Sequence, residues 1–203
     1  MKKFLIVLVC SSGISAFQIP GYTAASGLSV NLGGGLNIAG KSEMRANDTL
    51  PSFTNFTGSL NLWYGSLFKF GSGFFEVDTQ LGLYAGYVPV MTYKDQTTGK
   101  KSSDVKLPVI LDVRFINSKG FFAGLGGGYA HTIITTIDIT EATGPAAVVS
   151  LLTGWEISLP YGIQAGFTVR AMYFLQKIEA VNGSQLNNSQ LNIQPLLQVG
   201  YKF

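Results

Sequence analysis

Charged residues are scarce in this chain, and seven of them stand on the polar side of segments in which polar and apolar residues alternate. Four of the seven are acids and three are bases, so their charges nearly cancel. They are Glu76, Asp78, Asp112, Arg114, Glu156, Arg170 and Lys202. Opposite charges attract strongly once water is excluded from around them. We therefore predict an ion-pair network with a structural role. The alternative is that the same charges line a polar path or act as a gate.

Two acids of this set, Asp112 and Glu156, could act as general acid and general base. Nothing else in the sequence supports hydrolysis, because His131 is the only histidine and Cys10 the only cysteine. Cys10 also lies in a segment that we expect to be removed, which leaves no thiol for a disulfide or a metal site. No segment has the residue spacing of a calcium-binding loop. We expect no enzymatic activity, no metal and no cofactor.

The elements that carry these charges are predicted strands. The clearest one ends the chain: every second residue of 191–203 is apolar or aromatic, and the residues between them are mostly Gln, Asn, Gly and Lys. A period of two is typical of a strand with one polar and one apolar face. The same period predicts seven earlier strands, at residues 27–40, 56–66, 75–87, 107–115, 121–131, 149–159 and 163–175.

The connections between these strands alternate between long and short. Short turns are expected at 69–73, 117–120 and 160–162, and longer polar segments at 41–55, 88–104, 132–145 and 176–188. The sequence Asn-Ser-Lys-Gly at 117–120 has good turn chemistry. Because the number of strands is even, we expect both ends of the barrel chain to lie on the side of the short turns.

Composition limits the folds that eight such strands can form. The chain of 203 residues is 46% hydrophobic and only 12% charged, whereas roughly 25% of the residues in a soluble domain are charged. No apolar run reaches the ~18 residues of a membrane-crossing helix. Strands that cross a membrane must close into a barrel, because lipid cannot satisfy an open sheet edge. The sequence therefore predicts an all-β fold, an eight-stranded antiparallel up-and-down transmembrane β-barrel with a polar interior.

Charge placement predicts which face of the barrel is outside. No charge falls on the apolar face of a predicted strand, as expected where an Arg or Lys facing lipid would cost ~2–4 kcal/mol. Aromatic residues gather near strand ends, which is typical of the interfacial girdles of membrane proteins. Glycines recur on the inward face. They either leave room for large interior side chains, which is the interpretation we favour, or line a narrow cavity.

The first residues have the pattern of a secretory signal. Lys2 and Lys3 supply positive charge, residues 4–9 form an apolar core, and small residues follow. Lipidation at Cys10 is a less favoured alternative, because Val9 precedes it where lipoproteins usually have a small residue. The predicted divisions of the chain are a signal peptide at 1–16, a periplasmic lead-in at 17–26 and an outer-membrane barrel at 27–203.

The end of the chain carries a resemblance to a known class of proteins. Val199, Tyr201 and Phe203 place apolar and aromatic residues at alternate positions up to the terminus. This ending resembles the C-terminal membrane-insertion signal of bacterial outer-membrane β-barrel proteins. With the leader and the strand pattern, the mature chain resembles the small eight-stranded class that includes OmpA transmembrane domains, OmpX, OmpW and opacity-type proteins. The resemblance implies a location in the bacterial cell outer membrane.

The resemblance also implies a function and partners. We expect a non-enzymatic barrel whose surface-exposed loops serve structural or adhesion and host-interaction roles. The alternative is an OmpW-like narrow channel for passive transport of small molecules, including hydrophobic ones. Expected partners are outer-membrane lipid, the barrel-assembly machinery acting on the C-terminal strand, and a host or surface ligand at the loops. We expect a monomer. Without Lys2 and Lys3 the net charge falls from +3 to +1, and no basic patch indicates nucleic acid.

Overall fold

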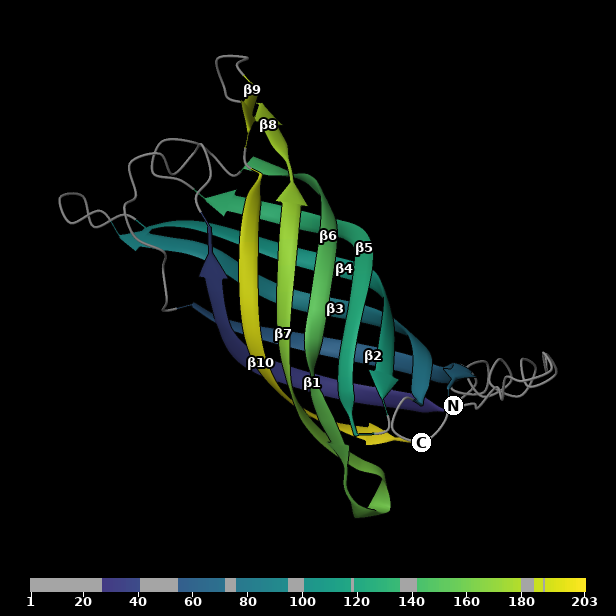
Figure 1. Cartoon of the computed structure of the whole chain (residues 1–203). Coiled ribbons are helices and arrows are strands. Elements are labelled where there is room, and N and C mark those ends of the chain that lie inside the picture. Colours follow the sequence, from purple (N-terminus) through teal and green to yellow (C-terminus); the bar gives the residue numbers. More distant parts are fainter. Residues whose placement is uncertain are drawn as a thin grey trace, which may run out of the picture.

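The alternating segments form eight long strands that close into one antiparallel barrel (Figure 1). In the computed structural model the order around the barrel is β1-β10-β7-β6-β5-β4-β3-β2, and the last strand pairs with the first. The predicted fold class is confirmed. The structure describes residues 27–40, 55–71, 76–94, 101–117, 119–135, 142–179, 185–187 and 189–203. The predicted signal peptide (1–16) and lead-in (17–26) lie outside these residues.

The elements of the fold have the following bounds. The barrel strands are β1 (Leu28–Ala39), β2 (Asn55–Phe70), β3 (Val77–Lys94), β4 (Lys101–Asn117), β5 (Phe121–Thr135), β6 (Ala142–Ser158), β7 (Ile163–Leu175) and β10 (Gln190–Lys202). A separate two-stranded sheet pairs β8 (Lys177–Glu179) with β9 (Gln185–Asn187). A short 3-10 turn, η3 (Pro160–Gly162), joins β6 to β7. Among the described residues, no helix is long and apolar enough to cross a membrane.

Side chains alternate between the two faces of the barrel wall, as a strand requires. On β1, Leu32 is 66% exposed on the outside, whereas its neighbour Asn31 is 1% exposed on the inside. Leu151 on β6 and Leu197 on β10 are likewise 65% and 71% exposed. A wall with an apolar outer face and a polar inner face suits a barrel surrounded by lipid. The prediction that the apolar face points outward is confirmed.

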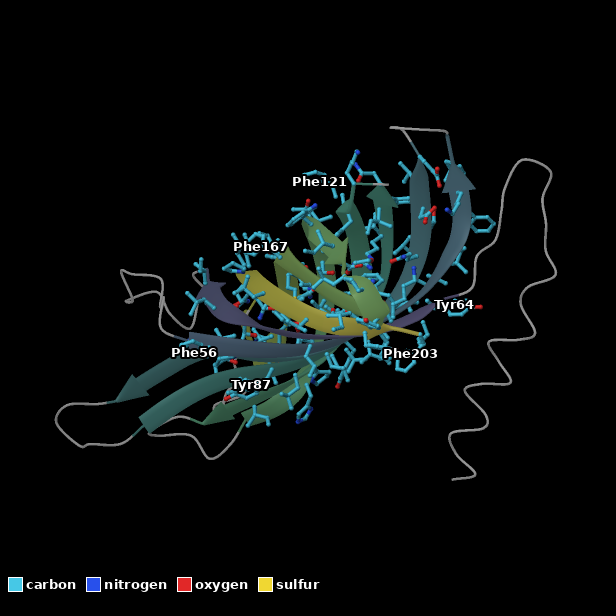
Figure 2. The ribbon with its side chains drawn as sticks, turned by 90° about the horizontal axis from the view of Figure 1, so that it is seen from below. Phe56, Tyr64, Tyr87, Phe121, Phe167 and Phe203 are labelled. Carbon is cyan, nitrogen blue, oxygen red and sulfur yellow. The ribbon has the colours of Figure 1, made fainter. Side chains whose placement is uncertain are left out.

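Large aromatic side chains also lie on the outer face, toward the two ends of the barrel. Phe56 and Tyr87 point outward at one end, and Tyr64 and Phe203 at the other (Figure 2). Phe56 is 77% exposed and Phe203 is 74% exposed. Two bands of aromatic residues at the ends of an apolar wall are the arrangement expected at the two membrane–water interfaces.

Two connections that were predicted as long polar loops are largely strand. β3 and β4 remain paired as far as Lys94 and Lys101, and β5 and β6 as far as Ile134 and Ala142. Most of the predicted loops at 88–104 and 132–145 therefore belongs to the sheet, and their assignment as loops was wrong. The reason is that hairpin pairing rests on backbone hydrogen bonds. Beyond the lipid, both faces of a hairpin can be polar, so the period of two is lost.

Pro145 is another residue that was predicted to lie in a loop but belongs to a strand, β6. It was predicted to end a loop, but it lies inside the strand and pairs with His131 of β5. Pairing of β6 with β7 begins only at Ala147, so β6 has an edge at Pro145, where a missing backbone N–H is tolerated. Part of the predicted loop at 176–188 also forms strand, as β8 and β9.

β2 runs past its predicted end at residue 66 and continues to Phe70. Its register against β3 shifts between Tyr64 and Phe68, near Gly65, which has a φ of 124°. Glycine adopts such a φ at little cost, and other residues do not. This irregularity interrupts the alternation where the predicted strand ended. Lys69 consequently lies in a strand and not in a turn.

The turn predicted at 117–120 is present between β4 and β5. Asn117 Oδ1 accepts hydrogen bonds from the backbone N–H of Lys119 at 2.9 Å and of Phe121 at 3.0 Å. Gly120 has a φ of 85°. An Asn side chain that binds the backbone two residues on, followed by a glycine in a left-handed conformation, is common turn chemistry.

Candidate functional site

The interior of the barrel is filled by side chains from many strands. The largest fully buried ones include two arginines and a lysine: Arg114, Arg170, Tyr84, Lys106, Phe174, Ile110, Met172, Leu196, Gln190, Gln194, Val88 and Val90. An eight-stranded barrel is just wide enough for side chains to fill its interior. The candidate site is therefore a series of packed clusters along the barrel and not an open bore.

One cluster surrounds the ion pair of Asp112 on β4 and Arg170 on β7. Arg170 Nη2 lies 2.7 Å from Asp112 Oδ2, and Nη1 lies 3.0 Å from Oδ1, a two-point contact that fixes geometry as well as charge. Ser150 donates to Asp112 Oδ1 at 3.2 Å and accepts from Arg170 Nη1 at 3.0 Å. The Arg170 guanidinium lies 4.1 Å from the centre of the Tyr84 ring. Both charged side chains are 1% exposed.

A second cluster surrounds Arg114 on β4 and Glu156 on β6. Arg114 Nη1 and Nη2 lie 3.2 Å and 3.4 Å from the two carboxylate oxygens of Glu156. Arg114 Nε donates to Gln80 Oε1 at 2.8 Å. The guanidinium also packs against the rings of Trp63 and Phe122, whose centres lie 4.1 Å and 4.9 Å away. Cation–π contacts of this kind are stronger when water is excluded, so the aromatic rings help to compensate the buried charge.

Glu156 links this cluster to other strands. Gln164 Nε2 on β7 donates to Glu156 Oε1 at 3.0 Å, and Asn31 Nδ2 on β1 donates to Oε2 at 3.3 Å. Together with Arg114 on β4, these contacts tie β6 to three other strands across the interior. A carboxylate so occupied by donors is suited to holding the wall together.

The acids nearest the end with the short turns form a third group. Lys69 Nζ lies 3.0 Å from Glu76 Oε1 and 3.7 Å from Asp78 Oδ1. These side chains are between 25% and 37% exposed, so water screens the pairs and each contributes at most ~1 kcal/mol. Sequence reasoning missed Lys69 because the irregularity after Tyr64 hid the continuation of β2.

The seven predicted charges are therefore not one network. Asp112 and Arg170 meet, Arg114 and Glu156 meet, and Glu76 and Asp78 share Lys69 at the barrel end. Lys202 is exposed, and none of the ion pairs found among the described residues includes it. The structural or gating role of these charges stays a prediction.

Lys106 is an interior charge that sequence reasoning missed. Its side chain is fully buried, with Nζ 3.6 Å from Asp104 Oδ1, 3.1 Å from Gln176 Oε1 and 5.4 Å from the centre of the Phe174 ring. Asp104 was assigned to a loop. A signal for both residues was present but overlooked: the inward-facing residues of β4 are even-numbered, and 104 and 106 continue the series that includes Asp112.

Between Lys106 and the two arginine clusters, an apolar cluster packs beside buried amide side chains such as Asn37, Asn192 and Gln194, each 0% exposed. A cluster of ten buried residues fills this part: Ala39, Tyr84, Val88, Val90, Ile110, Ala130, Ala146, Val148, Met172 and Phe174. Ile110, Met172 and Phe174 stand at inward positions of their strands. Apolar residues at inward positions are therefore the feature of the sequence that indicates this apolar layer.

Inward glycines adjoin the large interior side chains. A Cβ added to Gly82 would overlap the Trp63 ring, and one added to Gly154 would overlap the end of the Phe122 ring. Gly126 similarly leaves room for the Asp112 carboxylate. These contacts support the interpretation that the glycines provide packing space.

The residues with catalytic potential are not brought together. His131 lies on the outer face of β5, exposed and paired with Leu107 and Pro145, whereas Asp112 and Glu156 lie inside with arginine partners. Within the described ranges, no group of three His, Cys, Asp or Glu side chains could hold a metal ion. The interior is thus arranged for packing, and it offers no set of nucleophile, base and acid among these residues.

The predicted membrane-insertion signal lies on the outer face of β10. Val199 is 62% exposed, Tyr201 46% and Phe203 74%, and the rings of Tyr201 and Phe203 meet edge to face at 4.9 Å. The backbone N–H of Phe203 donates to the carbonyl of Leu28 at 2.8 Å, so the chain end is held against β1. Its role as a signal stays a prediction.

Comparison with solved structures agrees with this geometry. Neisserial surface protein A is 9% identical over 89% of this chain and 99% of its own, with a TM-score of 0.54. A major outer membrane protein from Thermus thermophilus is 13% identical over 88% and 100%, with a TM-score of 0.51. Ail, the attachment invasion locus protein of Yersinia pestis, is 11% identical over 88% and 99%, with a TM-score of 0.50.

The chain has the fold of the small eight-stranded outer-membrane β-barrels. No protein-family model and no curated protein matches its sequence, so the likeness rests on the closed barrel with its apolar outer wall and packed interior. Within this class of bacterial outer-membrane barrels the fold is compatible with several roles.

Proposed function

We propose that this chain is a non-enzymatic outer-membrane barrel whose exposed hairpins and loops form a contact surface for adhesion or host interaction. The observation that carries the proposal is a contrast between the two parts of the barrel. The interior is filled, while part of the wall continues well beyond the apolar belt. A conduit needs a bore, whereas a contact protein needs a rigid surface that clears the lipid headgroups.

The filled interior argues against the alternative of a conduit. Tyr84, Ile110, Met172 and Phe174 are each 0% exposed in the apolar layer, and the buried pair of Asp112 and Arg170 adjoins it through Tyr84. A water-filled path would leave such inward side chains accessible. The polar side chains beside this layer are occupied with one another: Tyr84 Oη donates to Gln194 Oε1 at 3.0 Å, and Asn37 Nδ2 donates to Asn192 Oδ1 at 3.1 Å.

The extended strands supply the contact surface. Pairing of β2 with β3 extends only to Gly58 and Tyr87, but β3 and β4 continue paired to Lys94 and Lys101. β5 and β6 also continue beyond the last pair of β6 with β7. These four neighbouring strands thus form a wall that rises on one side of the barrel (Figure 1). The names of Neisserial surface protein A and of the attachment invasion locus protein are in keeping with such a role.

Shortening the wall tests the proposal. Residues 93–102 are replaced by Asn-Gly, a pair suited to a two-residue hairpin turn, between the paired residues Thr92 and Ser103. Bacteria that display either chain are then compared for adhesion to epithelial cells and to glass. We expect adhesion to fall about tenfold or more, which corresponds to ~1.4 kcal/mol of binding free energy. Lys119→Ala, in the turn at the opposite end, is the matched control and should adhere normally. Unchanged adhesion of the shortened chain would contradict the proposal.

Conductance tests the alternative. The refolded barrel is inserted into a planar bilayer, and single-channel currents are recorded for the natural chain and for Arg170→Ala. We expect no reproducible openings in the natural chain, because side chains fill the interior. Openings in the natural chain whose size changes in Arg170→Ala would favour the conduit and overturn the proposal.

A further inference from the structure

The hairpin between β6 and β7 ends in an apolar, exposed tip. Tyr161 is 90% exposed, and Leu159 and Ile163 on either side are 43% and 42% exposed. No charged residue occurs between Glu156 and Arg170. Leu159 and Ile163 are odd-numbered like Trp155 and Phe167, the outward-facing residues of the two strands. The apolar belt of the barrel wall thus runs without a break to the end of this hairpin.

Tyr161 is held at the tip in an unfavourable conformation. It has a φ of 64° and a ψ of 23°, and among the described residues it is the one non-glycine residue with a positive φ. Turns usually place Gly, Asn or Asp at such a position. The turn is fixed by a hydrogen bond from the N–H of Leu159 to the carbonyl of Ile163 at 2.7 Å. Gly162, with a φ of 80°, completes the turn, and a Cβ added to it would overlap the carbonyl oxygen of Lys202 on β10.

A bulky ring that is both strained and exposed gains nothing from packing within the chain. A residue with a positive φ persists where something else outweighs its cost. The hydrogen bond between Leu159 and Ile163 holds the backbone of the turn, but the side chain of Tyr161 is 90% exposed and is therefore available to the surroundings of the protein. The side chain is amphipathic, with an apolar ring and a polar hydroxyl, which suits a boundary between an apolar and an aqueous medium.

The described residues next to the other two connections at this end include charged side chains. The turn after β4 presents the exposed side chain of Lys119, and the connection after β2 is flanked by the ion pairs of Lys69 with Glu76 and Asp78. Figure 1 shows the β6–β7 turn at the bottom of the view, projecting past the end of β10. The uncharged, exposed tip at 159–163 thus differs from the described residues next to the other two connections.

We propose that the tip at 159–163 is a membrane anchor, embedded in the headgroup region of the periplasmic leaflet with Tyr161 at the boundary. The occupant is phospholipid, because the surface of the tip is continuous with the lipid-covered belt through Leu159 and Ile163. This inference rests on the proposed membrane location. Its consequence is a fixed depth and tilt of the barrel, with the β6–β7 side sunk deeper than the side of Lys119.

Depth measurement tests the anchor. Cys10→Ser removes the natural thiol, and single cysteines at Tyr161, Lys119 and Leu197 carry an environment-sensitive fluorophore in phospholipid vesicles. We expect the probe at 161 to be blue-shifted and quenched by spin labels near the headgroup, and the probe at 119 to be quenched by aqueous iodide. Quenching of the probe at 161 by iodide alone would overturn the anchor and would instead fit a periplasmic protein partner. The probe at 197, in the middle of the belt, must be quenched by deep spin labels. If it is not, the membrane location itself is wrong.

A stability series separates the ring from the backbone strain. Tyr161→Ala retains a Cβ at the same φ and removes only the ring, whereas Tyr161→Trp retains an interfacial aromatic. We expect the urea midpoint in phospholipid vesicles to fall for the alanine variant and to hold for the tryptophan variant. Lys119→Ala is the control and should not shift the midpoint. An alanine variant as stable as the natural chain would show that the ring has no lipid contact and would refute the anchor.

Discussion

The two buried arginines depend on partners that lie within hydrogen-bonding distance. Arg170 and Asp112 are 2.7 Å apart and both are 1% exposed. Removing one member of such a pair leaves an uncompensated buried charge and costs ~3–5 kcal/mol. We therefore predict that Asp112→Ala lowers the free energy of unfolding by about that amount in a urea titration of vesicle-refolded protein. Lys69→Ala, at a half-exposed pair, should cost at most ~1 kcal/mol. Equal losses in the two variants would rule out a structural role for the buried pair.

Two glycines on opposite faces of the wall should respond oppositely to an added methyl group. A Cβ on Gly82 would overlap the Trp63 ring, whereas one on Gly34 would have no atom within 4 Å. Overpacking costs ~1–3 kcal/mol, while replacing a strand glycine by alanine gains ~0.5–1 kcal/mol. We predict that Gly82→Ala destabilises the barrel and that Gly34→Ala is neutral or slightly stabilising, as measured by urea midpoints. Destabilisation of both to the same degree would show that the inward glycines are not packing space.

The hairpin of β3 and β4 is an element whose outer part should be separable from the barrel. Its pairing beyond Thr92 and Ser103 lies outside the ladders with β2 and with β5, so that outermost part rests on the hairpin itself. We predict that the chain shortened at 93–102 refolds and keeps the heat-modifiable gel mobility of a closed barrel. Its unfolding midpoint should stay close to that of the natural chain. Failure of this variant to close would mean that the outer hairpin is needed for assembly.

At the scale of elements, the sequence predicts what lies in the membrane better than what lies beyond it. β7 begins at Ile163 and ends at Leu175, the bounds that were predicted for it, because lipid on one face and a packed interior on the other impose alternation. Beyond the lipid, this requirement for alternating residues no longer applies. The outer parts of β3 to β6 pair through their backbones, and polar side chains such as Thr, Ser and Lys show no period there.

The candidate site was predictable in part for the same reason. Asp112, Arg114, Glu156 and Arg170 stand out because each is a charge between apolar neighbours. Which of them pair could not be predicted, since pairing depends on the stagger of the strands around the barrel. Lys106 was missed because it lies between the predicted loop at 88–104 and the predicted strand at 107–115, although it continues the even-numbered, inward-facing positions of β4.

The whole molecule is divided along its axis into layers with different tasks. Half-exposed charges occupy the end near Lys69, two buried arginine clusters follow, and the apolar residues around Tyr84 and Phe174 fill the interior together with buried amides. Beyond it the wall of β3 to β6 continues, and the small sheet of β8 and β9 projects from the same end (Figure 1). Opening a path through the middle of the barrel would require breaking buried ion pairs and exposing buried apolar side chains. Motion and binding are therefore expected at the outer hairpins and not along the axis.

Assembly of the whole barrel depends on its last strand, which must close against the first. Phe203 is 74% exposed on the outside, while its backbone holds Leu28. Phe203→Ser keeps that backbone bond and removes only the ring. We predict that this variant accumulates in the outer membrane at a several-fold lower level, yet refolds in vesicles with a nearly unchanged midpoint, because the ring makes few contacts within the chain. Leu191→Ser, on the same face at the other end of β10, is the matched control and should reach the membrane normally. An equal deficit in both variants would indicate a loss of barrel stability and not of a recognition signal at the chain end.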